Sequence, residues 1–107
     1  MWGGKKTLLY SASGSIDIST LNIDVSSYSK IRVELLYLSN YICGILEVPM
    51  DEIDTTISED TTNRVAIITC SAQINGANIG SAFISQSKKI YRVVCSENAK
   101  IRVYGIN

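Results

Sequence analysis

The stretch Lys30-Ile31-Arg32-Val33-Glu34-Leu35-Leu36-Tyr37-Leu38 determines the fold class, because its side chains alternate in character. The apolar members at every second position are Ile31, Val33, Leu35 and Tyr37. The charged residues that lie between them are Lys30, Arg32 and Glu34. Successive side chains of a β-strand point to opposite faces of the sheet. This spacing therefore predicts a strand with one face buried in a core and one face directed outward.

Short runs of the same kind occur on both sides of this strand, and turn residues close each of them. The expected strands are 7–12, 15–23, 30–38, 41–48, 64–74, 77–85, 88–95 and 100–106. Asn75-Gly76 separates two of these runs and is a strong hairpin signal, because both residues tolerate positive φ. Such a series predicts an all-β fold, an antiparallel β-sandwich of about eight strands in one domain spanning 1–107. Both a jelly-roll and an Ig-like arrangement fit it.

Two of these strands carry expectations about their position. The run 41–48 is nearly all apolar, and Pro49 is expected to end it. An exposed apolar edge invites pairing with other chains, so we expect this strand to be central or covered by a neighbouring subunit. In the last strand, Ile101 and Val103 are expected to face inward, with Lys100 and Arg102 outward.

The overall composition argues for a folded domain and against several classes of partner. The chain has 107 residues, of which 46% are hydrophobic, so it can bury a core of its own. Ten basic residues balance ten acidic ones, which argues against nucleic-acid binding. No apolar run approaches the ~20 residues of a membrane-spanning helix, and no apolar region of a secretory signal follows Lys5 and Lys6. We therefore expect the chain to be made and folded in a cytoplasm and not to insert into a membrane.

The residues that usually carry catalysis are missing. There is no histidine, which excludes Ser-His-Asp and Cys-His arrangements and removes the commonest metal ligand. No phosphate-binding glycine loop and no nucleophile-elbow motif occurs. We therefore expect no catalytic residues, no cofactor and no enzymatic activity, and a small enzyme is the weakest of the functions considered.

Two other groups of residues could bind metal. Cys43, Cys70 and Cys95 lie in apolar runs without short spacing, so buried inert thiols are expected, with one disulfide or a reactive thiol as alternatives. Half of the acidic residues lie in the polar stretch 50–63: Asp51, Glu52, Asp54, Glu59 and Asp60. Their spacing matches no calcium loop. A solvated loop is expected there, with a weak cation or partner site as the alternative, and no metal site is assigned.

The aromatic residues are the candidates for contact with a partner or ligand. Exposed aromatic rings are favoured in sugar-stacking and protein-binding surfaces. The candidate contacts are Trp2, Tyr10, Tyr41 and Tyr91. The alternative is that the tyrosines pack as ordinary strand residues, with only the hydroxyl at the rim.

Two stretches together resemble a known group of proteins. Ser15-Ile16-Asp17-Ile18 is followed by Asp24-Val25-Ser26-Ser27-Tyr28-Ser29-Lys30-Ile31-Arg32-Val33, and the chain closes with Lys100-Ile101-Arg102-Val103-Tyr104-Gly105-Ile106. These patterns, which cover 8–33 and about 90–106, are similar to bacteriophage minor structural, tail-fibre and baseplate modules. The resemblance implies β-sandwich modules on phage particles that are often homotrimeric, often contact the host surface and have no catalytic residues. It also implies structural roles for Tyr28 and Tyr104.

The function expected from these observations is that of a non-enzymatic virion structural module, such as a tail-fibre, baseplate, capsid-decoration or head-fibre protein. The expected partners are further copies of the chain, with a trimer favoured, other virion proteins and a host surface glycan. The alternative is a monomeric carbohydrate-binding β-sandwich module, motivated by the fold class and the tyrosines.

Overall fold

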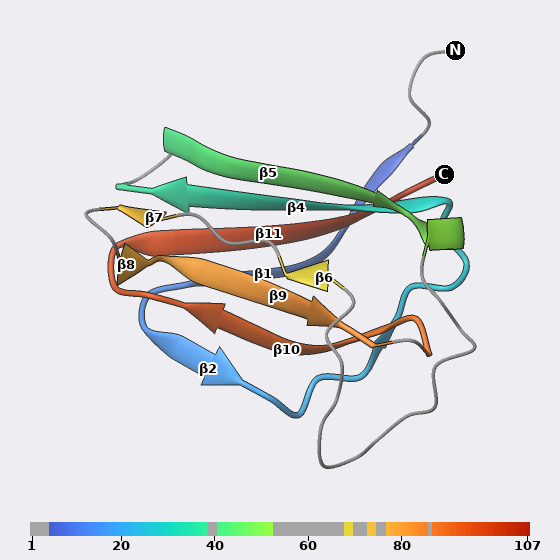
Figure 1. Cartoon of the computed structure of the whole chain (residues 1–107), viewed down its shortest axis with the longest axis horizontal. Helices are drawn as coiled ribbons and strands as arrows, with labels where there is room; N and C mark the ends of the chain where they lie inside the picture. Colours follow the sequence, from blue (N-terminus) through green and yellow to red (C-terminus); the bar gives the residue numbers. More distant parts are fainter. Residues whose placement is uncertain (1–4, 39–40, 53–67, 70–72, 75–76, 86) are drawn as a thin grey trace.

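The computed structural model describes residues 5–38, 41–52, 68–69, 73–74, 77–85 and 87–107. Within them the chain is all-β, and two antiparallel sheets pack face to face as predicted (Figure 1). The strands are β1 (Lys6–Ser13), β2 (Ile16–Ile18), β3 (Ile23–Asp24), β4 (Lys30–Tyr37), β5 (Tyr41–Pro49), β6 (Ile68–Thr69), β7 (Gln73–Ile74), β8 (Ala77–Asn78), β9 (Gly80–Ile84), β10 (Lys89–Cys95) and β11 (Ala99–Ile106). A 3-10 turn, Met50–Glu52, follows β5.

The strand order places the two ends of the chain side by side. The first sheet has four strands in the order β1-β11-β4-β5, and we call it the four-stranded sheet. The second sheet has the order β2-β10-β9-β6, with β3 also paired to β10, and we call it the five-stranded sheet. The first two strands therefore pair with the last two, β1 with β11 and β2 with β10. β7 and β8 form a separate pair.

The predicted strands are confirmed wherever the structure describes them, but three of them are divided. The run 64–74 contains β6 and β7, and the run 77–85 contains β8 and β9, and the two members of each run pair in different sheets. The run 15–23 forms two strands, β2 and β3, because Ser19–Asn22 lies outside the sheet between them while both strands pair with β10. Ile74 pairs with Ala77, so the hairpin predicted around Asn75-Gly76 is confirmed by the residues that flank it. Most of the stretch 50–63, and much of the run 64–74, lies outside the described residues.

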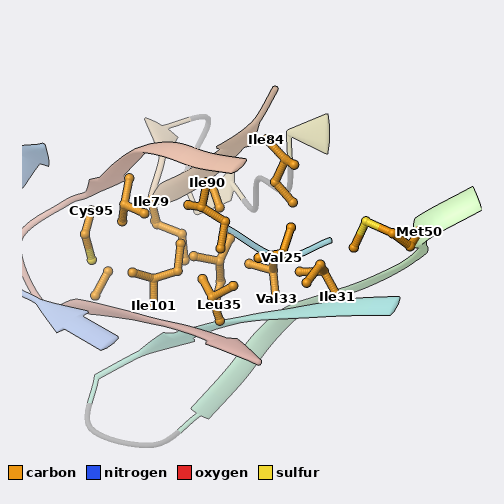
Figure 2. Packing of buried hydrophobic residues seen from close by; sticks show 14 residues of the cluster. Val25, Ile31, Val33, Leu35, Met50, Ile79, Ile84, Ile90, Cys95 and Ile101 are labelled. Atoms are coloured by element: carbon orange, nitrogen blue, oxygen red, sulfur yellow. The ribbon is translucent and has the colours of Figure 1, made fainter. Parts of the chain in front are cut away.

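The core lies between the two sheets, as Figure 2 shows. Ile31, Val33 and Leu35 of β4 are at most 1% exposed, as their alternation predicts. Ile101 and Val103 are also fully buried, and Tyr37 packs against the cluster at its margin. From the five-stranded sheet, side chains of β9 and β10 complete the cluster: Ala82, Ile84, Ile90, Val93 and Cys95. Each large aliphatic side chain buried here contributes roughly 1.5–3 kcal/mol to folding.

The connection between β3 and β4 is fixed by its own side chains. Val25 is fully buried between the sheets, and the Asp24 carboxylate accepts a hydrogen bond from the Ser26 backbone N–H at 2.9 Å. Tyr28 packs against the core, and its ring lies so close to Gly105 that a Cβ there would be 2.5 Å from a ring carbon. The structural role expected of Tyr28 is therefore confirmed. Glycine is needed at position 105 because the ring occupies the space of a side chain.

Of the two positions expected for the strand 41–48, the central one is wrong for the described residues, and cover by a neighbouring subunit stays a prediction. Among the described residues, β5 pairs only with β4, and Figure 1 shows it on the outside of the four-stranded sheet. The sequence of β5 resembles that of a central strand because apolar side chains lie on both of its faces. Leu46 and Val48 pack against the core, whereas Ile42 and Ile45 are 53% and 49% exposed. Pro49 ends the strand, as predicted.

Candidate functional site

The outer face of the four-stranded sheet is formed by the side chains that alternate with the core residues. On β4 these are Arg32, Glu34 and Leu36, and the antiparallel register sets Glu47 opposite Arg32 and Ile45 opposite Glu34. The charged residues of β4 thus point away from the core, as predicted. Glu34 is nevertheless only 4% exposed, although it lies on this outer face.

A chain of ion pairs crosses this outer face and explains how a carboxylate can be buried there. Glu34 Oε2 lies 2.8 Å from Arg32 Nε and 3.8 Å from Lys6 Nζ. Arg32 Nη1 donates a hydrogen bond to Glu47 Oε2 at 2.8 Å, and Lys30 Nζ lies 3.1 Å from Glu47 Oε1. The order is therefore Lys6–Glu34–Arg32–Glu47–Lys30. A buried carboxylate is tolerated only when it is paired in this way.

The pairing also shifts the pKa values of Glu47 and Arg32. Hydrogen bonds from Arg32 and then Lys30 lower the pKa of Glu47, and the Glu34 and Glu47 carboxylates raise the pKa of Arg32. Both shifts favour the charged forms of Glu47 and Arg32. The ion pairs hold these side chains in place on the outer face.

Half-exposed apolar side chains border the ion pairs at both edges of the sheet. Leu8 of β1 is 54% exposed at one edge, and Ile42 and Ile45 of β5 are exposed at the other. Between them, Lys6 Nζ lies 4.3 Å from the ring centroid of Tyr104. Tyr104 therefore stabilises the outer face and does not belong to the core cluster. Large side chains left half exposed on one face are typical of a surface that contacts another molecule.

A hollow of about 470 Å³ lies beside Tyr91, and we call it the Tyr91 hollow. Its lining consists of Ser19, Thr20, Leu21, Asn22, Ser85, Ser87, Lys89 and Tyr91. These residues come from the segment between β2 and β3, from the turn before β10, and from β10 itself. Hydroxyl, amide and ammonium groups around one aromatic ring are suited to bind a polyhydroxylated ligand. Volumes of this size are typical of small-ligand sites.

Contacts on the five-stranded sheet hold the rings near this hollow. The Phe83 and Tyr91 rings are tilted by 47° with centroids 6.1 Å apart, and Arg92 Cζ lies 5.1 Å from the Phe83 centroid. Arg92 donates two hydrogen bonds to Asp17, from Nε at 3.0 Å and from Nη2 at 2.7 Å. The Arg92 hydrogen bond lowers the pKa of Asp17. The guanidinium is thereby fixed over the Phe83 ring.

The four candidate contact residues fall in different places. Tyr91 lines the hollow, whereas Tyr10, on the other sheet, is partly buried and packs against the core. The backbone of Tyr41 opens β5, but its side chain lies outside the described part, as does all of Trp2. Sequence reasoning missed Lys89 and the segment 19–22. The polar break inside the run 15–23 was the one signal that could have indicated that segment.

The cysteines and acidic residues can be placed only in part. Cys95 is buried, as expected, and burial raises the pKa of its thiol, which disfavours the reactive thiolate. Asp51 is exposed, while Asp54, Glu59, Asp60, Cys70 and the Cys43 side chain lie outside the described residues. Within the described ranges, no three potential metal ligands gather.

Two further findings concern membrane-spanning helices and similarity to known proteins. None of the residues that the structure describes forms a helix long and apolar enough to cross a membrane. Comparisons of the chain with protein-family models, with curated proteins and with solved structures each found no match.

Proposed function

We propose that this chain is a non-enzymatic structural module that assembles with further copies of itself on a phage particle. The observation that carries the assembly is the outer face of the four-stranded sheet. Leu8, Ile42 and Ile45 are each about half exposed there. The phage setting rests on the resemblance of the segments 8–33 and about 90–106 to phage minor structural, tail-fibre and baseplate modules.

The ion pairs of the outer face compensate part of its charge. Arg32 and Glu47 are paired with each other and with neighbouring groups, while Lys100 and Arg102 of β11 add positive charge to the same face. Covering the apolar side chains of this face removes apolar area from water, at roughly 25 cal/mol per Å². A neutral chain also brings no long-range repulsion between its copies.

The direct test of assembly is the mass of the purified protein by size-exclusion chromatography with light scattering. A mass of two or more times the 11.7 kDa of one chain supports the proposal, and the resemblance favours the trimer. A chain that stays monomeric at high concentration contradicts self-assembly.

A second candidate function, carbohydrate binding, is favoured by the Tyr91 hollow. A module of this kind is expected to expose several aromatic rings. Tyr10, Tyr28 and Tyr37 instead pack against the core, so a sugar would bind in the hollow beside a single ring. A glycan array tests this function, with Tyr91→Ala expected to abolish any signal and Tyr104→Ala, on the other sheet, expected to keep it. An array without signal for the unaltered protein contradicts it.

A further inference from the structure

We propose that β5 pairs with β5 of a second copy, antiparallel about a two-fold axis, so that two four-stranded sheets join into one sheet of eight strands. The proposal rests on the proposed function in one respect, that the chain assembles with itself. It adds the contact and the register, and it replaces the trimer that the resemblance favours with a dimer, because edge pairing about a two-fold axis closes with two copies.

Among the described residues, the edge of β5 away from β4 is unpaired, and little charge protects it against pairing with another strand. Natural edge strands are guarded by lysines, prolines and bulges that twist the edge away. The opposite edge strand, β1, begins with Lys6, and its register shifts between Leu8 and Tyr10. β5 shares two of these features, because its pairing with β4 also shifts register, between Leu35 and Leu36, and it ends at Pro49. It differs from β1 in carrying no charge from Tyr41 to Leu46. It therefore presents the more accessible template for another strand.

The direction of the backbone groups places hydrogen-bonding atoms on this edge. The Met50 N–H donates to the Ser29 carbonyl, on the β4 side, at 2.8 Å. Backbone groups of alternate residues in a strand point to the same side, so those of Leu46 and Val48 point to β4. Those of Ile45, Glu47 and Pro49 point to the other side. The missing N–H of Pro49 thus costs the β4 ladder nothing.

The charge distribution selects a register centred on Ile45. Ile45 of each copy then exchanges both backbone hydrogen bonds with Ile45 of the other. The two Glu47 carboxylates are offset by four residues, about 13 Å along the strands. A register centred on Glu47 would set like charges directly opposite, which is unfavourable. In the favoured register, the two Ile45 side chains lie beside each other on the outer face, about 5.5 Å apart at Cβ.

The first experiment is sedimentation velocity on the full chain and two matched variants. Ile45→Lys and Leu8→Lys each place an ammonium group at a half-exposed position on the outer face, at opposite edges. We expect a dimer for the unaltered chain and for Leu8→Lys. For Ile45→Lys, which sets two ammonium groups side by side at the axis, we expect a dissociation constant at least tenfold higher.

A cross-linking experiment tests the register and does not depend on weakening the contact. Under mild oxidation Ile45→Cys should give a covalent dimer, because Cα atoms in directly opposite strand positions lie within disulfide range. Leu8→Cys and the unaltered chain, which share the native cysteines, should remain uncross-linked. Leu8→Cys that cross-links as readily as Ile45→Cys would overturn the proposed pairing.

The outcomes separate this inference from the function on which it rests. A trimer, or an Ile45→Lys variant that dimerises as well as Leu8→Lys, would overturn β5 pairing and leave self-assembly standing. An unaltered chain that is monomeric throughout would remove both. A dimer broken by Ile45→Lys alone would support both.

Discussion

The two faces of the four-stranded sheet are built from the same strands and differ in what covers them. The inner side chains of β4, such as Val33 and Leu35, are fully enclosed by the five-stranded sheet. Its outer side chains instead cover one another through ion pairs, which bury Glu34, while Ile45 on the neighbouring strand stays half exposed. Among the described residues no third layer covers this outer face. Leu36 is nevertheless buried there, whereas Leu8, Ile42 and Ile45 gain further burial only if another molecule covers them.

The largest expected effect on the free energy of unfolding comes from shortening a side chain of the inner face, with the same change on the outer face as its comparison. Leu35→Ala removes a fully buried side chain and should lower the free energy of unfolding by about 2–5 kcal/mol, through lost burial and the cavity left behind. Ile45→Ala, measured by urea denaturation at concentrations that keep the chain monomeric, should change it by less than about 0.5 kcal/mol. Equal losses at both positions would mean that the outer face is already covered within one chain.

A smaller effect is expected where β11 meets the connection between β3 and β4. Gly105→Ala places a Cβ 2.5 Å from the Tyr28 ring and should cost about 1–3 kcal/mol. In a Tyr28→Ala background the ring is gone, so the added cost of Gly105→Ala should largely disappear. Thermal unfolding of the four proteins in this cycle measures the coupling. An undiminished cost in that background would show that the ring is not the obstacle.

Removing one partner of the buried carboxylate tests the ion pairs of the outer face. Arg32→Met leaves Glu34 with Lys6 at 3.8 Å and should cost about 1–2 kcal/mol. Lys30→Met, which removes an exposed partner of Glu47, should cost less than about 1 kcal/mol. Adding Glu34→Leu to Arg32→Met should restore part of the loss. A loss that persists in the double variant would assign the effect to packing of the Arg32 side chain.

The smallest effect expected is a pH dependence at Glu47. Because Arg32 and Lys30 lower the pKa of Glu47 in the folded protein, its contribution is complete above its ordinary value of 4.5 and is lost as the pH falls through the lowered value. The melting temperature of Glu47→Gln should therefore fall less steeply than that of the unaltered chain between about pH 5 and pH 3. Parallel curves would show that this ion pair does not contribute.

Local patterns were sufficient to predict the strands and their faces but not what surrounds them. Alternation at Ile31, Val33 and Leu35 predicted the inner face because a period of two depends on neighbouring residues only. The burial of Glu34 depends on Lys6, which arrives from another strand, so no local pattern contains it. The edge position of β5 likewise depends on which strands pair.

The same limit applies to the candidate sites. Tyr91 was named from the sequence as an exposed aromatic candidate, but the hollow beside it also needs Asn22 and Ser85, which the fold alone brings together. Tyr10 looked equivalent in the sequence and packs against the core. An aromatic residue in a strand has no local signal that distinguishes these two outcomes, because the opposing sheet decides them.

The measurement that most directly tests the outer edge as a contact surface is hydrogen–deuterium exchange of single backbone amides at rising protein concentration. The Ile45 and Glu47 amides point to the unpaired side of β5, and the Leu8 amide on the unpaired side of β1 serves as the reference. The account predicts that exchange at Ile45 and Glu47 slows as concentration rises while exchange at Leu8 stays constant. Fast exchange at Ile45 and Glu47 at every concentration would contradict it.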